Sequence, residues 1–248
     1  MRHLLPALAC LLFCAPALAI TGNAPAANGW SAQAIVMVVD RRGDLCTGAA
    51  IARDLVLTAA HCVTRRRDDK IKVFQNGRTI SVRAYAVHPQ FNAENYARAR
   101  ATADLALLKL MAPLPESVVP AKLASARRVN VGEQLVIAGF GVSVEGTAAG
   151  LGVPRAATLT VTGQPGSLQI RLMDAVTRNQ RRGLGACTGD SGAPVFEPGA
   201  ANVIGVVSWS TAPNDEEGCG GLTGVTPLLN YRGWIEETAK KLGAPLMP

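Results

Sequence analysis

Short apolar runs separated by turn residues recur along most of this chain. Val, Ile, Leu and Thr dominate the runs, while Gly, Pro, Asn and Asp lie between them, a pattern typical of β-strands joined by turns. Six runs precede residue 111 and six follow residue 128: residues 34–40, 47–52, 55–60, 71–75, 78–88, 104–110, 133–140, 155–162, 167–173, 193–197, 202–209 and 221–228. Regular strand spacing without long helical patterns predicts an all-β fold, either barrels or sandwiches.

Two segments depart from the strand pattern. Residues 111–128 contain three prolines and no sustained period, so we interpret them as the connection between two six-stranded halves. Residues 230–242 carry apolar positions at helical spacing, and this predicts one C-terminal α-helix that packs on the body. Its mostly apolar face consists of Tyr231, Trp234, Ile235, Thr238 and Leu242.

The first nineteen residues are typical of a secretory signal peptide. Arg2 supplies the positive start, residues 4–18 are almost wholly apolar, and residues 17–19 form a small-x-small cleavage site. The apolar run is shorter than the roughly 20 residues that span a bilayer. We therefore expect a secreted or periplasmic protein without a membrane association after signal removal. A lipoprotein site at Cys10 fits less well, because the stretch before it is too short.

Composition narrows the class of protein further. The chain has 248 residues, of which 48% are hydrophobic and 17% are charged, and this apolar content excludes intrinsic disorder. The net charge of +7 is only weak evidence for acidic partners. The sequence contains no Gly-rich phosphate loop and no basic patch interleaved with aromatic residues, so we expect no nucleic-acid partner.

Four cysteines remain once Cys10 and Cys14 leave with the signal peptide. In an exported chain, four cysteines predict two disulfides, and they allow three pairings. A structural zinc site is the rival interpretation, but there is no Cys-x-x-Cys pair and the histidines are badly placed. The cysteines are Cys46, Cys62, Cys187 and Cys219.

Candidate catalytic residues lie in three short segments. Beyond the signal peptide the histidines are His61, at the end of a predicted strand, and His88, for which a structural role is favoured. Residues 189–192 read Gly-Asp-Ser-Gly, where flanking glycines let the N–H groups of Gly189 and Ser191 converge on one oxyanion. A plain turn is the alternative for this segment. Asp104 opens an apolar strand, either as a cap or as a buried carboxylate that orients an imidazole.

The order of these residues along the chain discriminates between enzyme classes. An α/β-hydrolase needs serine, acid and histidine in that order, but no histidine follows Ser191. A subtilisin-type enzyme needs the aspartate before the histidine, and its alternating strand and helix pattern is missing. The order His61, Asp104, Ser191 on β-barrels is the one that remains.

These segments resemble the chymotrypsin/trypsin family of serine endopeptidases. The matching segments are residues 57–62 (Leu-Thr-Ala-Ala-His-Cys), 104–108 (Asp-Leu-Ala-Leu-Leu), 187–194 (Cys-Thr-Gly-Asp-Ser-Gly-Ala-Pro) and 207–209 (Val-Ser-Trp). The resemblance spans residues 20 to about 240. It implies two six-stranded antiparallel β-barrels, one at residues 20–125 with His61 and Asp104, the other at residues 126–248 with Ser191 and the C-terminal helix.

The same resemblance implies a role for each site residue. His61 is then the general base and acid, Asp104 its orienting carboxylate, Ser191 the nucleophile, and the N–H groups of Gly189 and Ser191 the oxyanion hole. The implied disulfides are Cys46–Cys62 and Cys187–Cys219, and the implied substrate pocket consists of Gly185, Ala186, Ser208, Trp209, Ser210 and Gly224. Signal cleavage exposes Ile20, whose new ammonium group then pairs with Asp190.

Departures from the family pattern shape the expected specificity. Gly185 stands where trypsin-type members carry an aspartate, so we expect cleavage after apolar or small P1 residues rather than after Lys or Arg. The resulting hypothesis is a secreted, monomeric serine endopeptidase that acts on protein or peptide substrates without a cofactor or metal. The alternative is a catalytically silent binding or regulatory protein on the same fold.

Overall fold

The first six strands close into a barrel in the order β1-β2-β3-β6-β5-β4. This computed structural model describes residues 20–246 apart from 65–71, 76 and 99, so the predicted signal peptide lies outside the described residues. The strands are β1 (Ile35–Val39), β2 (Leu45–Ala52), β3 (Leu55–Thr58), β4 (Lys72–Gln75), β5 (Arg78–Val87) and β6 (Ala106–Leu110). Neighbouring strands are antiparallel, and β1 pairs with both β2 and β4, which closes the barrel.

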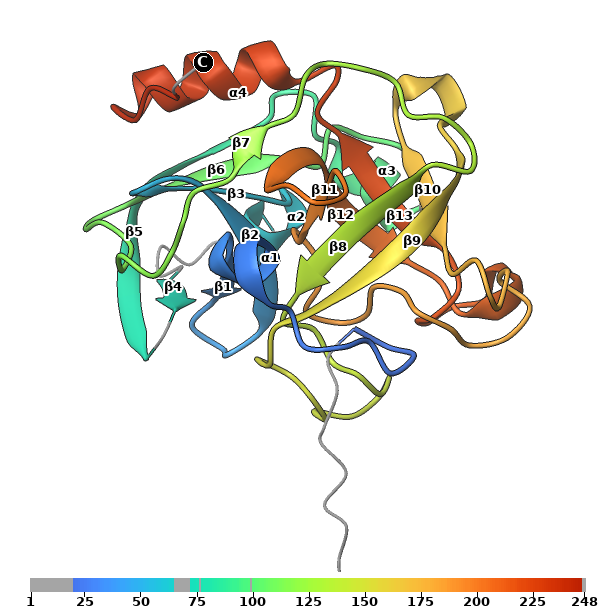
Figure 1. The fold of residues 1–248 in the computed structure, drawn as a ribbon. Coiled ribbons are helices and arrows are strands. Elements are labelled where there is room, and N and C mark those ends of the chain that lie inside the picture. Colours follow the sequence, from blue (N-terminus) through green and yellow to red (C-terminus); the bar gives the residue numbers. More distant parts are fainter. Residues whose placement is uncertain (1–19, 65–71, 76, 99, 247–248) are drawn as a thin grey trace, which may run out of the picture.

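The second half forms a sheet in the order β11-β8-β9-β10-β13-β12-β7, and an additional β11–β12 pairing closes six of its strands. These strands are β7 (Lys122–Leu123), β8 (Gln134–Gly139), β9 (Arg155–Gly163), β10 (Ile170–Met173), β11 (Pro194–Phe196), β12 (Asn202–Ser210) and β13 (Thr223–Pro227). The two sheets lie side by side (Figure 1). The predicted all-β fold of two barrels with a C-terminal helix is confirmed, while the domain limits near residue 125 stay a prediction.

One strand was not expected from the sequence. β7 comes from the proline-rich connection and pairs in parallel with the start of β12. Its two residues are too few to show an alternation of apolar and polar positions. A parallel pair of strands is also not joined by a short turn that the sequence could reveal. The strand ties the connecting segment to the second barrel.

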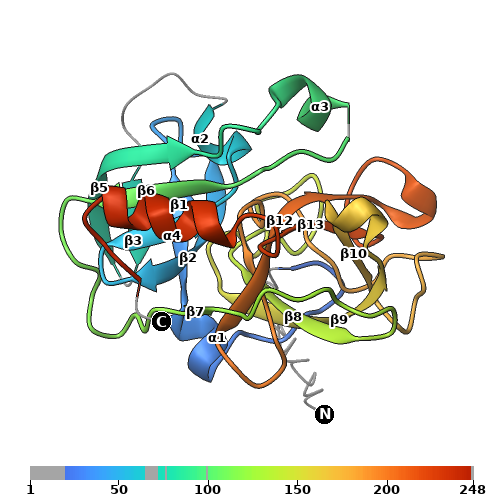
Figure 2. The same ribbon diagram turned by 90° about the horizontal axis from the view of Figure 1, so that it is seen from above.

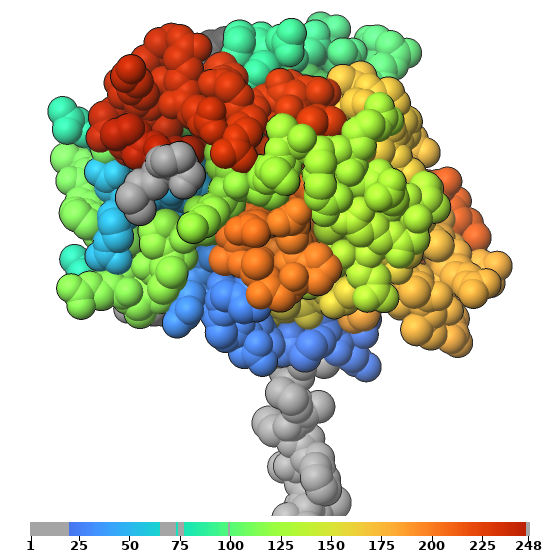
Figure 3. Space-filling model, turned by 45° about the horizontal axis from the view of Figure 1, so that its top comes forward, coloured from blue at the N-terminus to red at the C-terminus, as the bar shows by residue number. Residues whose placement is uncertain are grey.

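The C-terminal helix α4 (Arg232–Lys241) belongs to the second half of the chain but packs on the first barrel. Ile235 and Ala239 are fully buried in a cluster that includes the β6 residues Leu107 and Leu108. Burying these apolar side chains stabilises the contact between the halves. Figures 2 and 3 show the helix lying across the first barrel, against the connecting segment. Within the described residues, no helix has the length and apolar character needed to cross a membrane.

The remaining helical elements are short. They are α1 (Gly29–Gln33), α2 (His61–Thr64), α3 (Ala93–Ala97), and the 3-10 turns η1 (Pro165–Ser167) and η2 (Pro213–Asp215). Two of them matter for the site: α2 begins at His61 directly after β3, and α3 lies in the loop between β5 and β6. Helices this short contain too few residues to show a helical period, so they could not be predicted from the spacing of apolar positions.

Thr47 of β2 joins the first barrel to the segment before β11. Its backbone N–H donates to the carbonyl of Ser191 (2.8 Å) and its hydroxyl donates to the carbonyl of Gly189 (2.9 Å). The same hydroxyl oxygen accepts the N–H of Phe140 (3.1 Å), so one buried side chain holds three segments. The barrels therefore meet directly beside residues 189–191.

Candidate active site

The buried pair His61 and Asp104 forms the centre of the site. The Nδ1–H of His61 donates to Oδ2 of Asp104 (2.7 Å), and the backbone N–H of His61 donates to Oδ1 (2.9 Å). Asp104 is fully buried and lies just before β6, while His61 follows β3, the strand that pairs with β6. Strand pairing thus brings the two residues together, and the carboxylate fixes one tautomer of the imidazole, leaving Nε2 free of a proton.

Asp104 accepts a third hydrogen bond, from the other barrel. The hydroxyl of Ser208 on β12 donates to Oδ2 of Asp104 (2.6 Å), and both residues are buried. Hydrogen bonds to an ionised acceptor are short and stabilise the charged form. From the sequence, Ser208 was assigned only to the pocket strand; nothing in its immediate neighbours points to a carboxylate more than a hundred positions earlier.

Tyr96 of α3 covers the imidazole of His61. The two rings are stacked, with centroids 4.3 Å apart and an angle of 17° between their planes. Stacking favours one orientation of the imidazole and places aromatic electron density against any positive charge that it gains. Tyr96 could not be identified from the sequence, because its contact with His61 depends on how a short loop helix folds over the barrel.

Ser191 lies on the loop before β11, at the junction of the barrels. Ser191 is partly exposed, and its hydroxyl has no hydrogen-bond partner among the described residues. The backbone N–H groups of Gly189 and Ser191 also donate to no acceptor in the described part of the chain. Gly189 has a φ of +96°, a conformation that favours glycine. The hydroxyl can attack a carbonyl group, and the two unpaired N–H groups beside it can then donate to the oxyanion that forms.

A cleft of about 520 Å³ joins these groups. His61 and Tyr96 of the first barrel line it together with Gly189 and Ser191 of the second. The structure contains no hydrogen bond between the hydroxyl of Ser191 and the imidazole of His61, both of which it describes. Such contacts are often long in an unliganded site and tighten when substrate binds. The predicted His61 and Ser191 thus line one cleft, and the carboxylate of Asp104 lies behind the imidazole.

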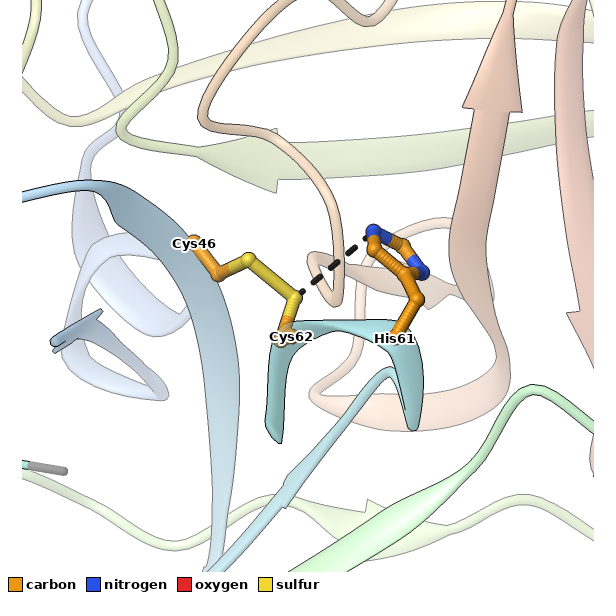
Figure 4. Close-up of side chains that lie close together, drawn as sticks. All are labelled: Cys46, His61 and Cys62. Atoms are coloured by element: carbon orange, nitrogen blue, oxygen red, sulfur yellow. Dashed lines mark hydrogen bonds between the residues drawn. A yellow bond between two sulfur atoms is a disulfide. The ribbon is translucent and has the colours of Figure 1, made fainter. Parts of the chain in front are cut away.

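A disulfide lies directly beside the imidazole. Cys46 is bonded to Cys62, and Sγ of Cys62 lies 3.8 Å from Nε2 of His61 (Figure 4). These three side chains are close enough together to suggest a metal site. However, metal binding by cysteine needs a thiolate, and both sulfurs are already joined to each other. The second disulfide joins Cys187 and Cys219, so both bonds have the pairing that the resemblance implied.

The predicted specificity pocket is only partly open. Its residues Ala186, Ser208, Trp209 and Ser210 line the cleft. Gly185 and Gly224 are buried and are not among the residues that line it. The indole of Trp209 lies against Gly224, where a Cβ atom would overlap the ring.

Asp190 is a fully buried carboxylate next to the nucleophile. It accepts the N–H of Gly141 at Oδ1 (2.8 Å) and the N–H of Cys187 at Oδ2 (2.9 Å). Burial nevertheless raises the pKa of Asp190 to about 7, because desolvation disfavours the charged form more than these two hydrogen bonds favour it. Ile20 is also buried, and Thr21 forms a β-bridge with Gly185. The segment that begins at Ile20 therefore runs beside the loop that carries Asp190.

Comparisons with known proteins point to one protein family. The family model described as "Trypsin" matches residues 19–235. The chain is similar to a trypsin from Phaedon cochleariae (31% identical, covering 77% of this chain and 78% of that protein). It is also similar to a trypsin from Sarcophaga bullata (29% identical, covering 79% and 80%) and to the snake venom serine protease rhinocerase 4 from Bitis rhinoceros (28%, covering 82% and 81%).

Solved structures show the same fold. Human heparin binding protein is 23% identical with a TM-score of 0.70, covering 92% of this chain and all of that chain. Neuropsin, a serine protease of mouse brain, is 22% identical with a TM-score of 0.68, covering 87% and 98%.

Proposed function

Since this chain belongs to the trypsin family of serine proteases, we propose that it is a secreted endopeptidase in which Ser191, His61 and Asp104 cleave peptide bonds. The observation that carries the proposal is the buried Asp104 carboxylate bonded to Nδ1 of His61, with Ser191 lining the same cleft. Membership of the family supports serine protease activity in general, and we infer the catalytic residues of this member from its site. Secretion is supported by two disulfides, which persist in oxidising compartments.

In the proposed mechanism, Oγ of Ser191 attacks the substrate carbonyl and Nε2 of His61 takes its proton. The N–H groups of Gly189 and Ser191 donate to the oxyanion of the tetrahedral intermediate. Asp104 stabilises the imidazolium, which then protonates the leaving amine as the C–N bond breaks. Water, deprotonated by His61, attacks the resulting ester, and loss of Ser191 from the second intermediate releases the acid product.

We propose that the preferred P1 residue is apolar or small. Gly185 provides no carboxylate to pair with Lys or Arg at the base of the pocket. Burying an unpaired cationic side chain there costs several kcal/mol, in the order of the usual desolvation penalty. We also propose that the protein acts on protein or peptide substrates and that it is a monomer.

Labelling with a fluorophosphonate tests the proposed nucleophile. We expect the processed protein to incorporate one phosphonyl group on Ser191, and the Ser191→Ala variant to incorporate none. Ser81→Ala is the matched control, because Ser81 is exposed on β5 and lies away from the cleft. A folded, processed protein that is not labelled supports a silent binding or regulatory protein instead.

Ser208→Ala tests whether the second barrel supports the carboxylate. Removing one charge-assisted hydrogen bond from buried Asp104 weakens its hold on the imidazolium, and such bonds contribute about 1.5–3 kcal/mol. We expect kcat to fall roughly tenfold or more with little change in KM, since the backbone that pairs with substrate stays in place. Steady-state kinetics across pH measure this, and an unchanged kcat and pH profile would count against the role.

A further inference from the structure

Trp209 occupies a position from which it can set the depth of the specificity pocket. The strand β12 pairs with β13, and Trp209 lies directly opposite Gly224 after a register shift at Ser208. Directly opposed residues of an antiparallel pair point their side chains to the same face. The indole therefore points to the face on which the side chain of residue 224 would lie.

Only glycine at position 224 allows this arrangement. A Cβ atom built on Gly224 would overlap the five-membered and six-membered rings of Trp209, touching the shared ring atoms and Nε1. The indole thus rests flat against the backbone of β13. The indole therefore covers Gly224, which is buried and does not line the cleft, whereas Trp209 and Ser210 do line it. Gly224, which the resemblance placed in the pocket, thus lies beneath an aromatic ring.

The indole is not fixed there by a hydrogen bond. Its Nε1 is buried and has no acceptor among the described residues. An unpaired buried donor is destabilising, so the packed position of the indole carries a penalty that the ring loses on moving outward. The neighbouring wall is held independently, because the hydroxyl of Ser210 donates to the carbonyl of Gly218 (3.1 Å). The ring can therefore turn without displacing the strand.

We propose that Trp209 is a specificity-determining residue that forms a movable floor of the pocket. With the indole on Gly224, the pocket accepts a small P1 side chain such as alanine, and a large apolar side chain enters only after the indole has turned out. This inference rests on the proposed function and refines its P1 preference, since it assigns the depth of the pocket to Trp209 rather than to Gly185.

Kinetics with two peptides that differ only at P1 test the proposal. We expect the processed protein to favour Ala over Phe by roughly tenfold or more in kcat/KM, a discrimination typical of pocket size. Trp209→Ala removes the floor, so its Phe/Ala ratio should rise at least tenfold over that of the native protein. An equal loss for both peptides, with the ratio unchanged, would overturn the proposal. Fluorophosphonate labelling of Ser191 in the same samples distinguishes this failure from failure of the proposed function.

Fluorescence provides a readout that does not depend on catalysis. Gly224→Ala forces the indole off β13, so we expect red-shifted emission and increased acrylamide quenching, both absent when the same change is made in Trp209→Phe protein. Gly163→Ala is the matched control, because a Cβ atom there meets nothing within 4 Å. Unchanged emission in Gly224→Ala would show that the indole does not rest on Gly224.

Discussion

Asp104→Asn is expected to lower kcat by about 10⁴-fold while the protein stays folded. The carboxylate accepts hydrogen bonds from Nδ1–H and the backbone N–H of His61 and from the hydroxyl of Ser208. An asparagine has one oxygen and one NH₂ group, so it cannot accept at both positions. Where its NH₂ faces Nδ1, it stabilises the tautomer that protonates Nε2, and His61 then cannot take the proton of Ser191.

Steady-state kinetics at pH 7.5 with one peptide substrate measure this effect. KM should change little, because Asp104 lies behind the imidazole and does not line the cleft. Asp215→Asn is the matched control: its side chain is exposed on η2 and bonds Asn179, and we expect a kcat within twofold of the native value. A loss below tenfold in Asp104→Asn would mean that the buried pair is structural and that proton transfer takes another route.

The strands could be predicted from the sequence because each has enough residues to show its pattern. Leu55–Thr58 and Ala106–Leu110 are fully buried runs, and each lies within a predicted strand. Pairing between them puts His61 and Asp104 together, so local pattern and chain order sufficed for this part of the site. The two-residue strand β7 could not be predicted, because its position depends on a partner eighty positions later.

Contacts between side chains from distant loops could not be predicted in the same way. Tyr96 stacks on His61, and Trp209 rests on Gly224, only because loop conformation and rotamer choice bring the rings there. The resemblance placed Gly224 in the substrate pocket. The indole of Trp209, from the paired strand β12, fills the space beside Gly224, and the residue type at one position cannot reveal this.

Asp190 is expected to make the uncleaved chain less stable as pH rises from about 4 to 7. Its ordinary pKa is 3.8, and burial raises the pKa of the folded state to about 7. Between these values the folded state binds more protons than the unfolded state, so the free energy of unfolding falls with rising pH. A carboxyl group whose pKa rises from 3.8 to about 7 on folding contributes about 4 kcal/mol to the stability of the folded state at low pH, and this contribution is lost above pH 7.

Urea unfolding at pH 5 and pH 8 measures this loss in a chain whose Ile20 is preceded by added residues. Asp190→Asn should remove most of the pH dependence, because the amide stays neutral while it keeps an acceptor for the N–H of Gly141 or Cys187. Asp174→Asn is a matched control, since Asp174 is another buried carboxylate that accepts two backbone N–H groups, from Val176 and Leu184. Equal pH dependence in the native chain and in Asp190→Asn would remove Asp190 as its source.

A chain that begins at Ile20 should not lose stability in this way. We expect its new ammonium group to pair with Asp190, and a paired carboxylate keeps its charge, so stability no longer falls between pH 4 and 7. We expect kcat/KM at pH 7.5 to exceed that of the extended chain by roughly 100-fold, because an ion pair at Asp190 fixes the adjacent N–H groups of Gly189 and Ser191. In the chain that begins at Ile20, Asp190→Asn should abolish this gain. Equal activity with and without the added residues would mean that the oxyanion donors are set by the hydrogen bonds of Thr47 alone.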